Sequence, residues 1–190
     1  ADEKRQLIAH AEQQLQLPPL SLQENNIQPD QLKQRRVIAS GKFLAGKYWL
    51  LDNRVFRGKV GYEVIAPLET DIGQIVLINR GWVPAPPTRQ QLPDVSFPLS
   101  KVIIQGRWKL IEKNSLSRDL ENLTAIEESW PIRVQSVDLF EMKRIIGKDI
   151  FWGYLQIDPE NSVALQVAWK NINVMPEKHL GYAVQWIAMA

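Results

Sequence analysis

Short runs of β-branched and aromatic residues recur through most of the chain. They lie at 35–43, 47–53, 59–68, 73–83, 101–112, 149–158 and 162–170, and Gly or Asp-Asn breaks separate several of them. Runs of this length and composition are typical of β-strands, and their close succession favours antiparallel pairing. The pattern predicts an α+β fold, mainly an antiparallel β-sheet or open barrel, with an N-terminal helix and one or two further helices packed to one side.

Helical spacing of apolar residues replaces this pattern near the N-terminus and again before the last strands. A helix is expected over 2–16, ended by Pro18-Pro19, and a short one is expected to open at Pro29-Asp30. Residues 137–147 form the third candidate, with one apolar face and Gly147 as the residue that ends the helix. The proline-rich stretch 83–94 is instead predicted to be a surface loop.

Two of the expected strands resemble each other. Residues 37–43 read VIASGKF and residues 102–108 read VIIQGRW, so each has V-I-x-x-G followed by a basic and then an aromatic residue. A glycine within a strand often marks a bulge or a close approach of two backbones, which is one interpretation of the similarity. The other is a duplicated half-domain.

Composition narrows the classes of function. The 190 residues are 45% hydrophobic and 23% charged, as in a globular domain rather than a disordered chain. A net charge of +2 gives no reason to expect nucleic-acid binding, which usually depends on clustered Lys and Arg. The chain has no cysteine, which excludes disulfides, thiolate metal sites and cysteine nucleophiles.

Signatures of catalysis are scarce. The sequence has no G-x-G-x-x-G, Walker or G-x-S-x-G motif, and its two histidines, His10 and His179, stand near opposite ends. A hydrolytic triad needs a histidine beside a nucleophile, and a zinc site usually needs several His or Cys ligands. The adjacent pair Glu127-Glu128 lies in a polar stretch and is expected to be solvated surface. We therefore expect a protein that is not an enzyme.

The stretch NRGWVP (79–84) closes an apolar strand with an arginine, a glycine and a tryptophan. In one interpretation Arg80 caps carbonyl groups and Trp82 covers the sheet edge. In the other, Arg80 grips a carboxylate with its bidentate fork, and Arg54 and Arg57 join it. The pattern alone does not show that these three arginines meet.

The last eleven residues, 180–190, are almost wholly apolar. On a helix that begins near Pro176, the residues His179, Tyr182 and Trp186 fall on one face. Tyr and Trp are favoured where a helix enters a membrane, and a neutral histidine at that level can ligate haem iron. An ordinary surface histidine is the alternative that spacing leaves open.

With these blocks identified, the chain resembles the Surfeit locus protein 1 family, the assembly factors of haem-copper cytochrome c oxidase. NRGWVP (79–84) and HLGYAVQW (179–186) carry the resemblance most specifically. Further matching stretches are EKRQLI (3–8), VIASGKF (37–43), GYEVIAPLE (61–69) and IIQGRW (103–108).

Members of that family have two transmembrane helices that flank a globular domain outside the energy-transducing membrane. The resemblance implies a single extracytoplasmic domain over 1–178, followed over 179–190 by the start of a truncated C-terminal transmembrane helix. It further implies an inner-membrane protein whose domain faces the bacterial periplasm or, in mitochondria, the intermembrane space. Its flanking helices would contact membrane lipid.

The same resemblance implies a role in oxidase biogenesis, with haem a bound and passed toward subunit I, and contact with other oxidase assembly factors. His179 matches the family's haem-linked histidine and is the expected axial ligand of the iron. Tyr182 and Trp186 are expected beside the macrocycle or at the membrane interface, and Arg80 is expected at a propionate. The alternative is a scaffold that stabilises an oxidase subunit without holding haem, with the loop 83–94 as part of its docking platform.

Overall fold

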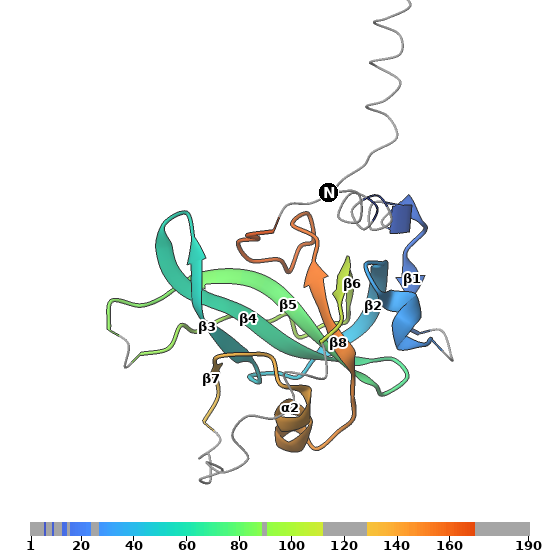
Figure 1. The fold of residues 1–190 in the computed structure, drawn as a ribbon. Coiled ribbons are helices and arrows are strands. Elements are labelled where there is room, and N and C mark those ends of the chain that lie inside the picture. Colours follow the sequence, from blue (N-terminus) through green and yellow to red (C-terminus); the bar gives the residue numbers. More distant parts are fainter. Residues whose placement is uncertain are drawn as a thin grey trace, which may run out of the picture.

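The computed structural model describes residues 6, 9, 13–14, 16–23, 27–88, 91–111 and 129–169. Its elements, in chain order, are β1 (Leu20–Ser21), the 3-10 helix η1 (Pro29–Leu32), β2 (Arg36–Phe43), β3 (Trp49–Phe56), β4 (Lys59–Thr70), β5 (Ile75–Pro84), β6 (Val102–Lys109), β7 (Ile132–Val134), the helix α2 (Leu139–Ile146) and β8 (Ile150–Ile157). Figure 1 shows the long strands β4 and β5 crossing the molecule, with α2 beneath them.

Five strands close into a barrel in the order β2-β6-β8-β5-β4, because β4 also pairs with β2. Four of these pairings are antiparallel, and β5 with β8 is parallel. Beyond the barrel, β3 and β7 extend the sheet from β4, and β1 lies against β2. The expectation of a mainly antiparallel sheet is confirmed, but the barrel is closed rather than open.

The barrel interior is filled by alternate residues of its strands, as the two-residue period of a strand requires. In β6, Ile104 and Trp108 are buried inside, whereas Ile103 and Gln105 point outward. Trp108 packs edge-on against Phe151 of β8, with ring centroids 5.4 Å apart. These side chains belong to one continuous apolar core inside the barrel.

The two similar strands are direct partners. In the β2–β6 register, Val37 faces Gly106 and Gly41 faces Val102. At Gly41 strand β2 pairs with both β6 and β4, and at Gly106 strand β6 pairs with both β2 and β8. A methyl group on Gly41 would overlap the carbonyl of Glu69, and one on Gly106 would overlap that of Gln156. Both glycines therefore mark close backbone approaches, as the first interpretation of the repeat predicted.

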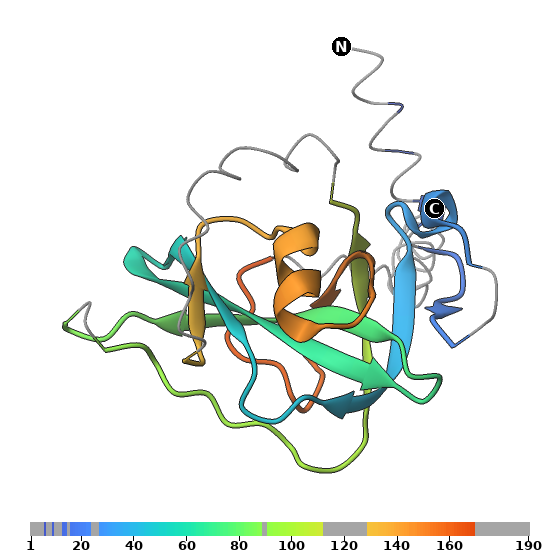
Figure 2. The same cartoon turned by 90° about the horizontal axis from the view of Figure 1, so that it is seen from below.

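A second apolar cluster lies on the outer side of the sheet, beneath α2. Trp49, Ile65 and Leu77 face outward from β3, β4 and β5, and Met142 of α2 covers them. The helix begins where the Asp138 carboxylate accepts the N–H groups of two residues in its first turn, and it ends at Gly147 in the left-handed conformation. Figure 2 shows α2 lying across the outer face of the strands.

Most expected elements are found, with a few differences. The helix predicted over 137–147 is α2, and Pro29-Asp30 open the short helix η1. The strand predicted over 162–170 is wrong, because among the described residues of that range, 162–169, only Gln166 forms a bridge, to Trp82. The loop expected over 83–94 starts later, since β5 runs to Pro84. Most of the helix expected over 2–16 lies outside the described residues.

Candidate functional site

Arg80 lies inside the barrel wall rather than at its surface. It continues the inward face of β5 formed by Val76 and Ile78, and it is 4% exposed. Its Nε donates to the carbonyl of Val163, and one terminal nitrogen donates to the carbonyl of Ser96, both at 2.9 Å. Burial lowers the pKa of this guanidinium to about 10, so it remains charged at neutral pH.

Two aromatic rings complete the surroundings of Arg80. The guanidinium carbon lies 4.5 Å from the ring centroid of Phe97 and 5.4 Å from that of Phe43. Ring faces attract a cation, which offsets part of the cost of removing it from water. Arg80 therefore joins the loop after β5 to the segment after β8, as the carbonyl-capping interpretation predicted. The described contacts of Arg80 include neither Arg54 nor Arg57.

The residues around Arg80 reinforce this junction. The Asn79 side chain donates to Glu63 at 2.6 Å and accepts the N–H of Gly81 at 3.1 Å. Gly81 has φ +114°, and a methyl group there would lie 2.7 Å from the carbonyl oxygen of Gln166. The N–H of Trp82 donates to that same oxygen at 2.6 Å. We call these contacts between 79–82 and 163–166 the latch.

The other expected binding residues, His179, Tyr182 and Trp186, lie outside the described residues. The expected boundary at 178 and the apolar run that follows it lie outside them too. Of the predicted set, the structure therefore places Arg80 alone. The latch holds residues 163–166, so the NRGWVP block fixes this segment against β5.

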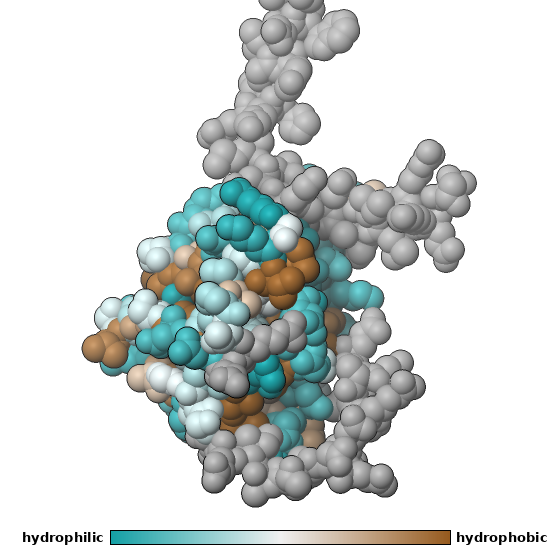
Figure 3. Space-filling view, turned by 90° about the vertical axis from the view of Figure 1, so that its left-hand side faces the viewer, coloured by the Kyte–Doolittle hydropathy of each residue, from teal (hydrophilic) through white to brown (hydrophobic). Residues whose placement is uncertain are grey.

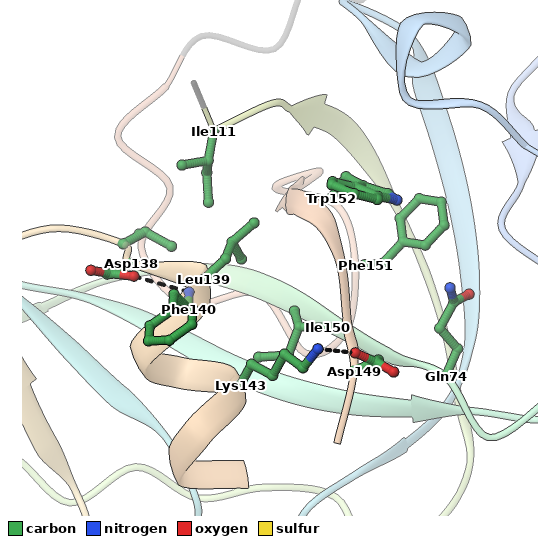
Figure 4. A pocket seen from close by; sticks show the side chains of 11 residues that line it. Gln74, Ile111, Asp138, Leu139, Phe140, Lys143, Asp149, Ile150, Phe151 and Trp152 are labelled. Carbon is green, nitrogen blue, oxygen red and sulfur yellow. Dashed lines mark hydrogen bonds and ion pairs between the residues drawn. The ribbon is translucent and has the colours of Figure 1, made fainter. Parts of the chain in front are cut away.

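A pocket of about 440 Å³ lies at the barrel end where β8 begins, beside α2. Its lining comes from the end of β6, the loop before β5, and from α2 and β8 with the residues leading into them (Figure 4). The lining residues are mostly apolar: Gln74, Ile111, Val137, Asp138, Leu139, Phe140, Lys143, Asp149, Ile150, Phe151 and Trp152. This volume and character are typical of binding sites for a small molecule or a large side chain.

Two aromatic residues at the pocket are unusually exposed. Phe140 is 60% exposed and Trp152 is 55% exposed. Lys143 and Asp149 form an ion pair beside them, so that rim carries little net charge. The sequence signal for this site is the FW pair at 151–152, because alternation along a strand must turn one of two adjacent aromatic residues outward.

Cationic side chains continue from the pocket along the outside of the barrel. Arg36 faces Arg107 across the β2–β6 pair, and Lys109 follows Arg107 on the same face of β6. We call these three residues the basic strip. Arg36 is paired with Asp158, whereas no hydrogen bond or ion pair links Arg107 or Lys109 to any carboxylate in the described part of the chain.

The pKa values of both cations are lowered, chiefly by burial. Burial, and secondarily the neighbouring Arg107, lowers the pKa of Lys109. Burial also lowers the pKa of Arg107, where the attraction of Asp158 opposes it and the repulsion of Arg36 adds to it. Partly buried cations without a bonded partner favour an anionic ligand.

Within the described ranges, no group of three or more His, Cys, Asp or Glu residues is arranged to hold a metal ion. The same ranges contain no helix that is both long and apolar enough to cross a membrane. On the side of the molecule where β3 turns into β4, hydrophobic patches are separated by hydrophilic residues (Figure 3).

Comparison with known proteins identifies a matching family and several similar proteins. The model of the SURF1 family matches residues 1–190. An uncharacterised SURF1-like protein of Mycobacterium tuberculosis is 28% identical over 180 residues, which cover 92% of this chain and 64% of that protein. This chain therefore spans less than two thirds of the length of that relative.

Two eukaryotic proteins are also similar. A SURF1-like protein of Dictyostelium discoideum is 33% identical over 95 residues, covering 45% of this chain and 35% of that protein. The cytochrome oxidase assembly protein SHY1 of Saccharomyces cerevisiae is 32% identical over 162 residues, covering 74% of this chain and 41% of that protein. The match to the family model spans the whole chain, and the chain therefore belongs to the SURF1 (Surfeit locus protein 1) family.

Proposed function

We propose that this protein takes part in the assembly of cytochrome oxidase, by binding components rather than by catalysing a reaction. The observation that carries the proposal is membership of the SURF1 family over all 190 residues. The similarity to a yeast protein named for oxidase assembly supports it. The pocket and the basic strip are features suited to binding, which agrees with such a role.

Deletion of the gene in its source organism tests this role. We expect the membranes to lose most of their cytochrome oxidase activity and haem a absorbance, while transcription of the oxidase genes is unchanged. A plasmid copy of the gene should restore both signals. Normal oxidase activity in the deletion strain would contradict the proposal.

We infer further that haem a is a cargo of this protein, held through His179 and passed toward subunit I. Tyr182 and Trp186 would lie beside the macrocycle or at the membrane interface. The support is the HLGYAVQW block (179–186), which carries the family resemblance. Arg80 does not fit the part of propionate partner in its described position, because two carbonyl groups and two rings surround its guanidinium.

A spectral comparison tests His179. The protein with both membrane segments is co-expressed with haem A biosynthesis, and purified as wild type, His179→Ala and the control His10→Ala. We expect haem a in the wild type and the control, and its loss in His179→Ala with the domain still folded by circular dichroism. Haem in all three would show that another residue ligates the iron. Haem in none would overturn the cargo proposal.

The same proposal includes a membrane anchor and an extracytoplasmic domain. Its support is the apolar run 180–190 together with family membership. Fusion of alkaline phosphatase after residue 170 of the full-length protein should give an active reporter in a bacterial host, since that enzyme matures only outside the cytoplasm. An inactive phosphatase fusion, with an active cytoplasmic reporter at the same site, would contradict the orientation.

The scaffold alternative has its own support in the exposed aromatic residues of the pocket. In that case the protein would hold an oxidase subunit without holding haem. Co-purification of subunit I with His179→Ala protein free of haem would favour the scaffold. If subunit I dissociates whenever haem is absent, the cargo role is favoured instead.

A further inference from the structure

The pocket and the basic strip form one continuous band on the outside of the barrel. Arg107 faces Gln156 and Lys109 faces Tyr154 across the β6–β8 pair. Ile111, two residues after the end of β6, and Trp152, two residues before Tyr154 in β8, line the pocket. Every second residue belongs to the band, and these residues change from the cations Arg107 and Lys109 to the apolar Ile111 at the pocket.

The band is unbalanced in charge. Asp158 lies at its far end and is already paired with Arg36, and among the described residues no ion pair joins Arg107 or Lys109 to a carboxylate. At the pocket itself Lys143 pairs with Asp149, and the carboxylate of Asp138 accepts the N–H groups of Phe140 and Glu141 at the start of α2. The apolar end therefore favours an uncharged group, and the strip favours carboxylates beyond it.

We propose that this band is the docking surface for an extended segment of a partner protein. The segment carries a bulky apolar side chain that enters the pocket, followed on the same face by two carboxylates that reach Lys109 and Arg107. Same-face side chains of an extended peptide are about 6.8 Å apart, which is also the spacing along β6. The recognition pattern is therefore Φ-x-[D/E]-x-[D/E], where Φ is aromatic or a large aliphatic residue.

The dimensions and exposure of the pocket agree with such an anchor. Its volume of about 440 Å³ is enough for one large side chain and part of its backbone. Phe140 and Trp152 stand exposed at the pocket and would be covered when the anchor binds. Aromatic anchors in pockets usually contribute most of the energy of such contacts, while surrounding charges set orientation and association rate. The proposal does not depend on which complex the partner belongs to.

A fluorescein-labelled peptide, GSFSESESG, tests the surface by fluorescence anisotropy with the purified protein. We expect a micromolar Kd at about 50 mM salt, weakening as salt is raised. Replacing the phenylalanine by serine, or both glutamates by lysine, should abolish binding. Equal binding of all three peptides, or no binding by the first, would overturn the proposal.

Variants of the protein locate the contact. Trp152→Ala and Lys109→Glu should each weaken binding about tenfold, and Lys109→Gln should weaken it less. The matched controls Leu99→Ala and Lys59→Glu change exposed residues outside the band and should leave the Kd unchanged. Circular dichroism confirms that each variant is folded. If the two band variants bind as the controls do, the peptide binds elsewhere and the proposal fails.

A competition experiment distinguishes a peptide from a small molecule as the ligand of the band. If the apolar anion 1-anilinonaphthalene-8-sulfonate binds in a manner sensitive to Trp152→Ala, but the peptide does not bind, the band is a small-molecule site and the peptide proposal is wrong. Displacement of the dye by the peptide supports the proposal. Neither measurement requires oxidase or haem, so their failure leaves the assembly role standing.

Discussion

Arg80 carries a positive charge into the barrel wall, where its side chain is 4% exposed. The cost of burying this charge is offset by the carbonyls of Val163 and Ser96 and by the faces of two aromatic rings. Two segments outside the strands thereby obtain a fixed contact with β5. At the residue scale, Arg80 therefore links β5 to the segments that contain Ser96 and Val163.

Arg80→Met should destabilise the fold by about 2–4 kcal/mol, because two carbonyl groups lose charged donors. Urea denaturation followed by tryptophan fluorescence measures the change. The control Arg133→Met removes an exposed arginine with a long 3.9 Å ion pair and should cost less than about 0.5 kcal/mol. A variant of unchanged stability that no longer binds haem would instead revive Arg80 as a propionate partner.

At the scale of elements, β2 pairs with two neighbouring strands at Gly41, where the barrel closes, and β6 pairs with two at Gly106. Gly41 and Gly106 lie at these points, where the neighbouring backbones leave no room for a Cβ atom. The glycine of the VIxxG repeat is thus needed in both β2 and β6, because a Cβ atom at either position would overlap a neighbouring carbonyl group. Their antiparallel register brings the two copies face to face, with each glycine opposite the first valine of the other copy.

Gly106→Ala should destabilise the protein by about 3 kcal/mol or more, because the added methyl group overlaps the Gln156 carbonyl and the two backbones must separate. Gly41→Ala should have a similar effect through Glu69. Thermal unfolding by circular dichroism measures both. Gln105→Ala, one residue away and facing outward, is the control; a loss as large as that of Gly106→Ala would contradict the explanation.

At the scale of the whole molecule, the latch and the pocket lie at opposite ends of the barrel. The segment after β8, which the latch holds, lies at the end opposite to α2 (Figure 1). The latch fixes the last described part of the chain, and α2 with the start of β8 supports the pocket. A side chain bound in the pocket would therefore lie at the end of the barrel away from the latch.

Gly81→Ala should loosen the latch, because alanine is strained at φ +114° and its Cβ would lie 2.7 Å from the Gln166 carbonyl. Amide hydrogen exchange should speed up at Leu165 and Trp82, which donate across the latch, more than at barrel amides such as that of Ile104. Gly73→Ala adds strain in open space and should leave the latch amides protected. Uniform acceleration in both variants would show that the latch unfolds only with the barrel.

Local sequence patterns predicted secondary structure correctly where the environment of a residue depends on its neighbours in sequence. The positions of β2 to β6, α2 and β8 follow from runs of β-branched residues, helical spacing and turn residues. The strand predicted over 162–170 is wrong for a physical reason. Val163 is buried, and Leu165, Val167 and Trp169 pack against the barrel core without forming a strand, so apolar composition reflects burial there and not backbone pairing.

The sequence by itself determined the strand-rich class, the place of α2 and the family, and it singled out the two VIxxG glycines without deciding their role. Only the tertiary structure decided that the barrel closes, that Arg80 faces inward and that Ile111, Phe140 and Trp152 line one pocket. Periodicity along the chain records how buried each residue is, which is a local property. Closure, the latch and the pocket depend on pairing between strands far apart in sequence, and that register is set by the packing of the whole core.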